Sequence, residues 1–150
     1  MPAKLLIPLD AYRNSKTAEE YAVKLHEKMP LKAVLLHVID TKELDGHGID
    51  PGLKESILSA KRKTGEKIVS QAAEAFKAAG IEFERIIITG DPSHLICYTA
   101  KTEDVDMVLM AESGRSEFQD WFVGSVTNYV LYRCTTPVLL VKHPRGANPN

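Results

Sequence analysis

The chain has 150 residues, which is the length of one domain and enough for a single hydrophobic core. Apolar residues make up 44% and charged residues 26%, a balance that excludes a largely disordered chain. Lys and Arg total 19 against 20 for Asp and Glu, so no basic field indicates a nucleic acid or a membrane surface as partner. The longest apolar runs are strand-sized, far below the roughly 20 residues that span a bilayer.

Five short apolar runs are the main feature of the sequence. Each is almost continuously apolar or β-branched, which is typical of parallel strands covered on both faces. The runs occupy residues 5–9, 33–39, 83–88, 105–110 and 137–141.

Helical patterns separate these runs. Apolar residues recur at three- and four-residue steps in 15–29 and again in 53–79. Asp91-Pro92-Ser93 opens a third helix, and Gly124-Ser125 opens a fourth that runs to about Cys134. The polar stretch 40–52, between the second strand and the second helix, is predicted to be a long surface loop.

This alternation predicts an α/β fold, a single doubly wound domain over residues 1–150. We expect a five-stranded parallel sheet with helices on both faces, in a Rossmann-like arrangement. Residues 143–150 carry two prolines and a glycine and are predicted to form a loose tail.

The two cysteines, Cys97 and Cys134, form no CxxC pair. We expect them to be separate thiols that act as small core residues. The N-terminus enters an apolar strand at once, without the pattern of a signal peptide. These features together predict a cytoplasmic location.

Candidate ligand-binding residues follow the strands, because open parallel sheets bind ligands beyond the carboxyl ends of their strands. After the fourth run come Ala111 to Ser116, with a glycine at Gly114, and then Gly124-Ser125 at a helix start. Glycines let backbone N–H groups approach an anion, and a helix N-terminus presents unpaired N–H donors. The pattern indicates a phosphate cradle without the P-loop lysine. Turn glycines with an N-cap serine are the alternative interpretation.

The sequence resembles the universal stress protein family over residues 4–142. The resemblance rests on short segments in the family's order: Ile7-Pro8-Leu9-Asp10, Leu35-Leu36-His37-Val38, Gly90-Asp91-Pro92, Asp106-Met107-Val108-Leu109-Met110, the spacing G-x9-G-S from Gly114 to Ser125, and Pro137-Val138-Leu139-Leu140-Val141. It implies an adenine nucleotide alpha hydrolase-like fold and a stress-response or regulatory protein that binds ATP or AMP, with Mg²⁺ as a possible companion of ATP. It also implies a homodimer formed through the last strand, from Pro137 to Val141.

The resemblance also assigns site residues. It implies an adenine and ribose end at Pro8, Leu9, Asp10 and Val38, with Met110 and Ala111 beside the ribose. The phosphates would lie along Gly114, Arg115, Ser116, Gly124, Ser125 and Val126.

Two residues depart from the family pattern. Ala111 replaces the first glycine of the motif, and its methyl group would be prohibitive if the backbone required positive φ. Glu112 places a carboxylate where relatives have a small or basic residue, which would repel phosphates. Arg115 could compensate as a phosphate partner.

Two other functions remain open. The first is a universal stress fold without nucleotide that acts as a homodimeric protein-interaction module. The second is a phosphoacceptor receiver domain, favoured by strand order and Lys142-His143-Pro144 but opposed by the lack of an acidic pair after the first strand. We expect His37 to be a hydrogen-bonded core histidine, and we expect no metal site. No catalytic constellation stands out, so enzymatic activity beyond a slow ATPase is not expected.

Overall fold

A computed structural model describes residues 1–10, 13–46, 48–112 and 124–142. Its strands are β1 (Ala3–Pro8), β2 (Leu31–Asp40), β3 (Glu82–Gly90), β4 (Met107–Ala111) and β5 (Val138–Val141). Its helices are α1 (Arg13–His26), α2 (Pro51–Ala78), α3 (Pro92–Thr102), α4 (Ser125–Arg133) and the short 3-10 helix η1 (Lys42–Leu44). The predicted tail at 143–150 lies outside the described residues.

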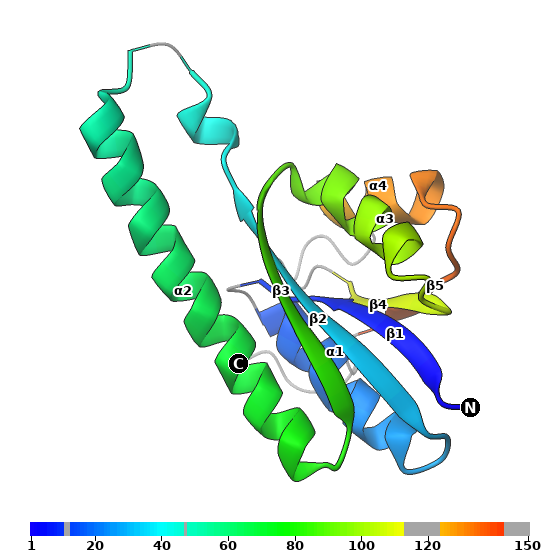
Figure 1. Cartoon of the computed structure of the whole chain (residues 1–150). Coiled ribbons are helices and arrows are strands. Elements are labelled where there is room, and N and C mark those ends of the chain that lie inside the picture. Colours follow the sequence, from blue (N-terminus) through cyan, green and yellow to red (C-terminus); the bar gives the residue numbers. More distant parts are fainter. Residues whose placement is uncertain (11–12, 47, 113–123, 143–150) are drawn as a thin grey trace, which may run out of the picture.

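The five strands form one parallel sheet in the order β3-β2-β1-β4-β5 (Figure 1). The predicted doubly wound α/β fold is therefore confirmed. The chain adds β2 and β3 on one side of β1, and β4 and β5 on the other. A receiver domain has the order 2-1-3-4-5 instead, so the receiver interpretation is wrong. The carboxyl ends of β1 and β4 flank the point where the strand order reverses, which is where such folds bind ligands.

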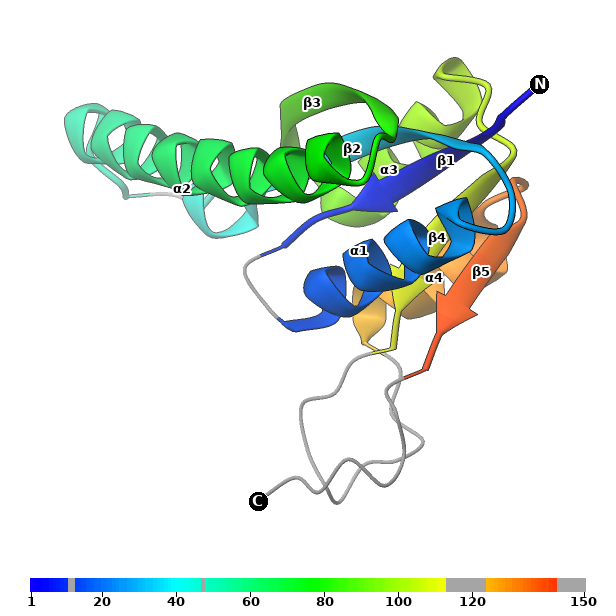
Figure 2. The same cartoon turned by 90° about the horizontal axis from the view of Figure 1, so that it is seen from below.

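Helices cover both faces of the sheet (Figure 2). Because side chains alternate along a strand, neighbouring residues of β1 enter different cores. On one face, Leu5, Ile7 and Leu35 of the sheet form a core with Ala18 of α1 and Phe76 of α2. On the other face, Leu6, Val34 and Leu36 form a core with Ile96 of α3 and Val130 of α4. Burial on both faces explains the continuous apolar stretches at residues 5–7 of β1 and 33–36 of β2.

Aspartate side chains start the second and third helices. The Asp50 carboxylate accepts hydrogen bonds from the backbone N–H groups of Gly52 and Leu53, so α2 begins at Pro51, two residues before the predicted start. Asp91 caps α3 by accepting from Ser93 N–H. The first turns of α2 extend beyond the ends of the strands (Figure 1). They lie beside η1, whose Leu44 is buried, so the predicted surface loop is partly structured.

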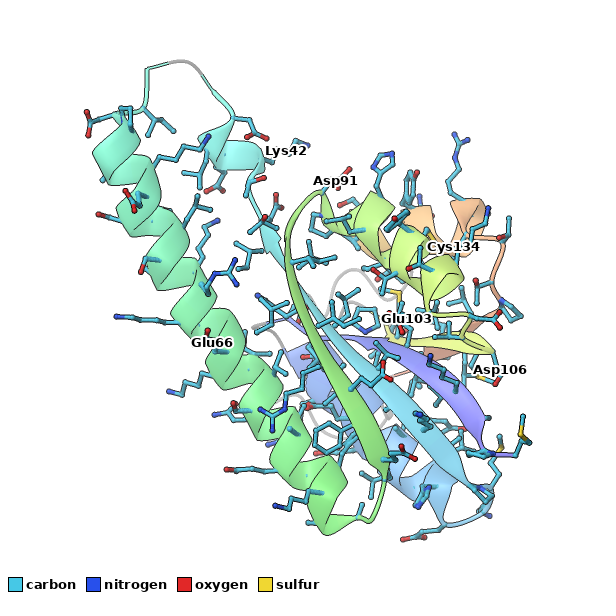
Figure 3. The ribbon with its side chains drawn as sticks, in the orientation of Figure 1. Lys42, Glu66, Asp91, Glu103, Asp106 and Cys134 are labelled. Carbon is cyan, nitrogen blue, oxygen red and sulfur yellow. A yellow bond between two sulfur atoms is a disulfide. The ribbon has the colours of Figure 1, made fainter. Side chains whose placement is uncertain are left out.

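A disulfide joins Cys97 on α3 to Cys134 at the end of α4 (Figure 3). The prediction of two separate thiols is therefore wrong. The helices lie side by side on one face of the sheet and bring the two Cα atoms within 5.2 Å, a proximity that sequence spacing does not reveal. A reducing compartment cannot be argued from unpaired thiols, and the cytoplasmic location stays a prediction. Over the described ranges, no helix has the length and apolar character of a membrane span.

Candidate functional site

A cavity of about 630 Å³ opens at the carboxyl ends of β1, β2 and β4. Helices α1, α2, α3 and α4 contribute the rest of its wall. Seven of the predicted site residues line it: Pro8, Leu9, Asp10, Val38, Met110, Ala111 and Val126. The structure thus brings together the residues assigned to the adenine and ribose end.

The residues predicted to lie along phosphates are only partly described. Gly124 is the N-cap of α4 and has no side chain of its own that could cap that helix end. Ser125 is the first helical residue and is exposed. Val126 and the buried Thr127 of the same first turn line the cavity, so the N-terminus of α4 lies at its wall. Gly114, Arg115 and Ser116 lie outside the described residues.

Helix α2 supplies a wall that the sequence did not reveal. Ala60, Lys61, Thr64 and Ile68 line the cavity. The Lys61 ammonium donates a hydrogen bond to the backbone carbonyl of Asp40, with Nζ and O 3.0 Å apart. This bond ties α2 to the end of β2, and it places a cation beside the cavity. The sequence pattern predicts a helix here, but it does not show which turns of the helix reach the cavity.

His37 also lines the cavity. Its Nδ1 lies 2.8 Å from the carbonyl oxygen of Leu9. A carbonyl only accepts, so Nδ1 carries the proton in this hydrogen bond. The predicted hydrogen bond is confirmed, but the ring is half-buried at the cavity rather than enclosed in the core.

The cavity combines apolar walls with a few polar groups. Aliphatic side chains from both sheet and helices supply most of the lining, including Leu9, Leu36, Ile39, Val38, Ile68 and Ile96. Carboxylates come from Asp10 and Asp40, and hydroxyl groups from Ser15, Thr64 and Thr127. The Ser15 hydroxyl donates to the backbone carbonyl of Asp10, 3.0 Å away, and so ties the first turn of α1 to the residue beyond the end of β1. Such a lining suits a flat aromatic group that carries a polar substituent.

The two departures from the family pattern have different surroundings. Ala111 is buried and pairs with Val141 in the sheet. Among the non-glycine residues that the structure describes, only Asp104 has positive φ, so the Ala111 methyl group causes no backbone strain. Glu112 donates its backbone N–H to the carbonyl of Val141, 2.9 Å away. Its half-buried side chain does not line the cavity.

The described part of the chain contains no cluster of three His, Cys, Asp or Glu side chains able to hold a metal ion. Asp91 caps α3, and its side chain bonds to His94, also on that helix. The hydrogen bond from His94 lowers the pKa of the Asp91 carboxyl group. Both observations assign Asp91 to the helix start.

Comparisons with known proteins agree with this geometry. A sequence model of the Universal stress protein family matches residues 1–142. Universal stress protein YxiE of Bacillus subtilis is 30% identical over 150 residues, covering 93% of this chain and 98% of its own. The solved structure of MJ0577, a universal stress protein of Methanocaldococcus jannaschii, superposes with a TM-score of 0.82 at 24% identity, covering 96% and 98% of the two chains. An Arabidopsis thaliana family protein with AMP bound gives a TM-score of 0.74 at 19% identity, covering 99% and 97%.

Proposed function

Because the chain belongs to the universal stress protein family, we propose that its cavity binds an adenine nucleotide, ATP or AMP. The observation that carries the proposal is the cavity itself. Residues from three strand ends, which the family resemblance assigns to adenine and ribose, line one apolar space at the switch in strand order. The AMP bound to the Arabidopsis family protein supports the same ligand class. The proposed role is regulatory or stress-responsive, with occupancy of the site as the signal.

The adenine would lie between apolar groups at the ends of β1 and β2. Pro8, Leu9 and Val38 offer the wall for the base, and the Asp10 carboxylate accepts hydrogen bonds from the nucleoside. Met110 and Ala111 would border the ribose. This arrangement orients the phosphates toward the N-terminus of α4.

The phosphates would meet backbone donors at the start of α4. The first N–H groups of a helix have no partner within the helix, and Gly124 provides no capping side chain. The nine-residue helix also directs the positive end of its dipole toward this point. We infer that Gly124, Ser125 and Val126, together with Gly114, Arg115 and Ser116, hold the phosphates. Mg²⁺ with ATP would need one or two carboxylates in addition to phosphate oxygens, and Asp10 and Asp40 are the carboxylates at the cavity.

Two measurements on the purified full chain test this function. Mass spectrometry of small molecules released by denaturation should detect ATP, ADP or AMP. Titration calorimetry of nucleotide-free protein should give saturable binding of AMP and ATP, with guanine nucleotides as the matched control. If no adenine nucleotide is released and none binds at millimolar concentration, the proposal is wrong.

The alternative, a homodimeric interaction module, has its own supporting observation. Strand β5 is an edge strand, and in the described part of the sheet it pairs only with β4. An apolar edge strand with unpaired backbone groups favours pairing with a second copy. We propose that two chains associate along β5 by a two-fold axis, whether or not nucleotide is bound.

A further inference from the structure

We propose that Cys97–Cys134 is a reversible redox site, reduced by a dithiol, that controls the phosphate end of the cavity. The effect on the cavity rests on the proposed nucleotide binding, whereas the redox chemistry does not. The argument starts from what the bond encloses. Its ends are 37 residues apart, and the segment between them contains β4, the N-terminus of α4 and every residue assigned to phosphate. The bond therefore closes a covalent ring around the predicted phosphate-binding segment.

Each cysteine is connected to the cavity wall. Cys97 follows Ile96 on α3, and Ile96 is buried and lines the cavity. Cys134 is the C-cap of α4, whose other end carries the cavity residues Val126 and Thr127. A displacement of the sulfur atoms can therefore reach the cavity wall through Ile96 on α3 and through the short helix α4 itself.

Helix α4 depends on α3 for its position. Among the described elements, α3 is its main neighbour. The side-chain contacts there include the buried Val130, which belongs to the same apolar core as Ile96, and the ring of Tyr129, whose centroid lies 5.0 Å from that of His94. For a nine-residue helix, the covalent bond to α3 adds a strong attachment to this packing, and reduction removes it.

The two cysteines are within reach of a reductant. Both residues are half-buried, and their neighbours Tyr98 and Arg133 are exposed. In the exchange, a thiolate of the dithiol attacks one sulfur and displaces the other as a thiolate, which takes up a proton. The second thiol of the reagent then attacks the mixed disulfide. Overall, the protein disulfide gains two electrons and two protons to become two thiols, and the dithiol becomes a disulfide.

Reduction should loosen the phosphate end more than the adenine end. Opening the ring restores conformational freedom to the enclosed segment, which must be ordered again when phosphates bind. The residues at the ends of β1 and β2 lie outside the ring and keep their positions. We expect ATP affinity to fall by roughly fivefold or more on reduction, and adenosine affinity to change less.

The experiment compares the air-oxidised full chain, the same protein in excess dithiothreitol, and the double variant Cys97→Ser/Cys134→Ser. Thiol titration in denaturant should detect no free thiol in the oxidised protein and two after reduction, with removal of dithiothreitol and exposure to air, whose oxygen takes up the two electrons, restoring the bond. Hydrogen exchange should accelerate in α4 and stay slow in β1 and β2. The serine variant should match the reduced protein and should not respond to dithiothreitol.

Two results would overturn the proposal: free thiols in the oxidised protein, or equal exchange in α4 before and after reduction. Equal ATP affinity in the two states, with α4 exchange changed, would overturn the coupling to the cavity. If no adenine nucleotide binds in either state, the proposed function fails, and thiol titration and exchange still decide whether the redox site exists.

Discussion

The imidazole ring of His37 lies directly against the backbone of Gly65 on α2. A Cβ atom at Gly65 would lie 2.5 Å from Cδ2 of the ring and 3.0 Å from Nε2. Gly65 is buried, so it lets the helix approach β2 at the cavity. The absence of a side chain at Gly65 therefore allows α2 and the His37 ring to lie in contact at the cavity wall.

Gly65→Ala should lower the free energy of unfolding by about 1–2 kcal/mol, measured from the midpoint and slope of urea unfolding. Helix propensity alone would give the opposite sign, because alanine is favoured over glycine by about 1 kcal/mol inside a helix. We expect the steric conflict to exceed that gain, since relieving it moves the ring away from the Leu9 carbonyl.

Two variants control this prediction. Gly46→Ala should have little effect, because a Cβ there meets no atom within 4 Å. In a His37→Ala background the ring is absent, so Gly65→Ala should then stabilise the protein. A stabilising effect of Gly65→Ala with His37 present would contradict the contact.

Asp10→Ala should weaken adenine-nucleotide binding by roughly 1–3 kcal/mol in calorimetry, because a carboxylate that accepts from the nucleoside is removed. Asp45→Ala removes an exposed carboxylate from a residue that does not line the cavity, and it should leave the affinity unchanged. Equal affinity in both variants, with circular dichroism unchanged, would remove Asp10 from the site.

Glu112→Gln should tighten ATP more than AMP, because the carboxylate follows the cavity residue Ala111 on the path assigned to the phosphates. The gain should shrink at high salt, where ionic screening weakens the repulsion. Ala111→Gly alone should add little, since Ala111 has ordinary strand geometry. A gain that is independent of phosphate number would exclude a direct charge effect.

Leu140→Pro should convert a β5 dimer into monomer, measured by sedimentation at micromolar concentration. Val108 and Glu112 donate their N–H groups to the carbonyls of Pro137 and Val141, so the backbone groups of alternate residues in β5 face β4. By this alternation the N–H of Leu140 faces the open edge, where proline removes a donor from the dimer only.

Leu140→Ala is the matched control, because it removes the side chain, keeps the N–H, and should stay dimeric. Leu139→Pro is unsuitable, since the backbone groups of Leu139 face β4 and the change would disrupt the sheet itself. An unaltered protein that sediments as a monomer would disprove the dimer.

Glu19 should make stability depend on pH. The side chain borders a groove of about 560 Å³ between α1 and α2, where burial raises its pKa from 4.5 to about 7. Lys16 opposes this shift, and Glu20 and Asp10 add to it. Between pH 4.5 and about 7 the folded state binds more protons than the unfolded state, so stability should fall as pH rises.

Glu19→Gln should remove this decline. The free energy of unfolding of the variant minus that of the unaltered protein should be roughly 1–3 kcal/mol larger at pH 8 than at pH 4. Urea unfolding at both pH values measures this difference. Lys16→Met should enlarge the decline, because the ammonium group lowers the pKa of Glu19. Parallel pH profiles for the unaltered protein and Glu19→Gln would contradict the burial effect.

The fold could be predicted because two-sided burial determines the composition of a parallel strand. The run at 33–39 is apolar except for His37, and in the structure Ala33 to Leu36 alternate between two helix-covered cores. The position of the cavity could be predicted for a related reason. Residues such as Asp10 and Met110 end parallel strands, and those ends meet at one edge of the sheet in any order of the strands.

The α2 wall and the disulfide depend on distances that no local pattern contains. Lys61 and Thr64 reach the cavity only because the 28-residue α2 starts well beyond the sheet and returns along it. Cys97 and Cys134 meet only because α3 and α4 are neighbours on one face. Helical periodicity predicts which side of a helix is buried, but not which helix it faces or at what height.

The strand order divides the chain into a part that can assemble early and a part that follows. Strands β1, β2 and β3, with α1 and α2, all come from residues 3–90. Strand β4 pairs with β1 from much farther along the chain: beside this pairing, the Lys4 N–H donates a hydrogen bond to the carboxylate of Asp106, 102 residues away. During synthesis from the N-terminus, three of the five strands can therefore form a sheet while its second face is still uncovered. Leu6, Val34 and Leu36 would then be exposed until α3 and α4 emerge. The nascent chain thus presents a temporary apolar surface of the kind that chaperones at the ribosome bind.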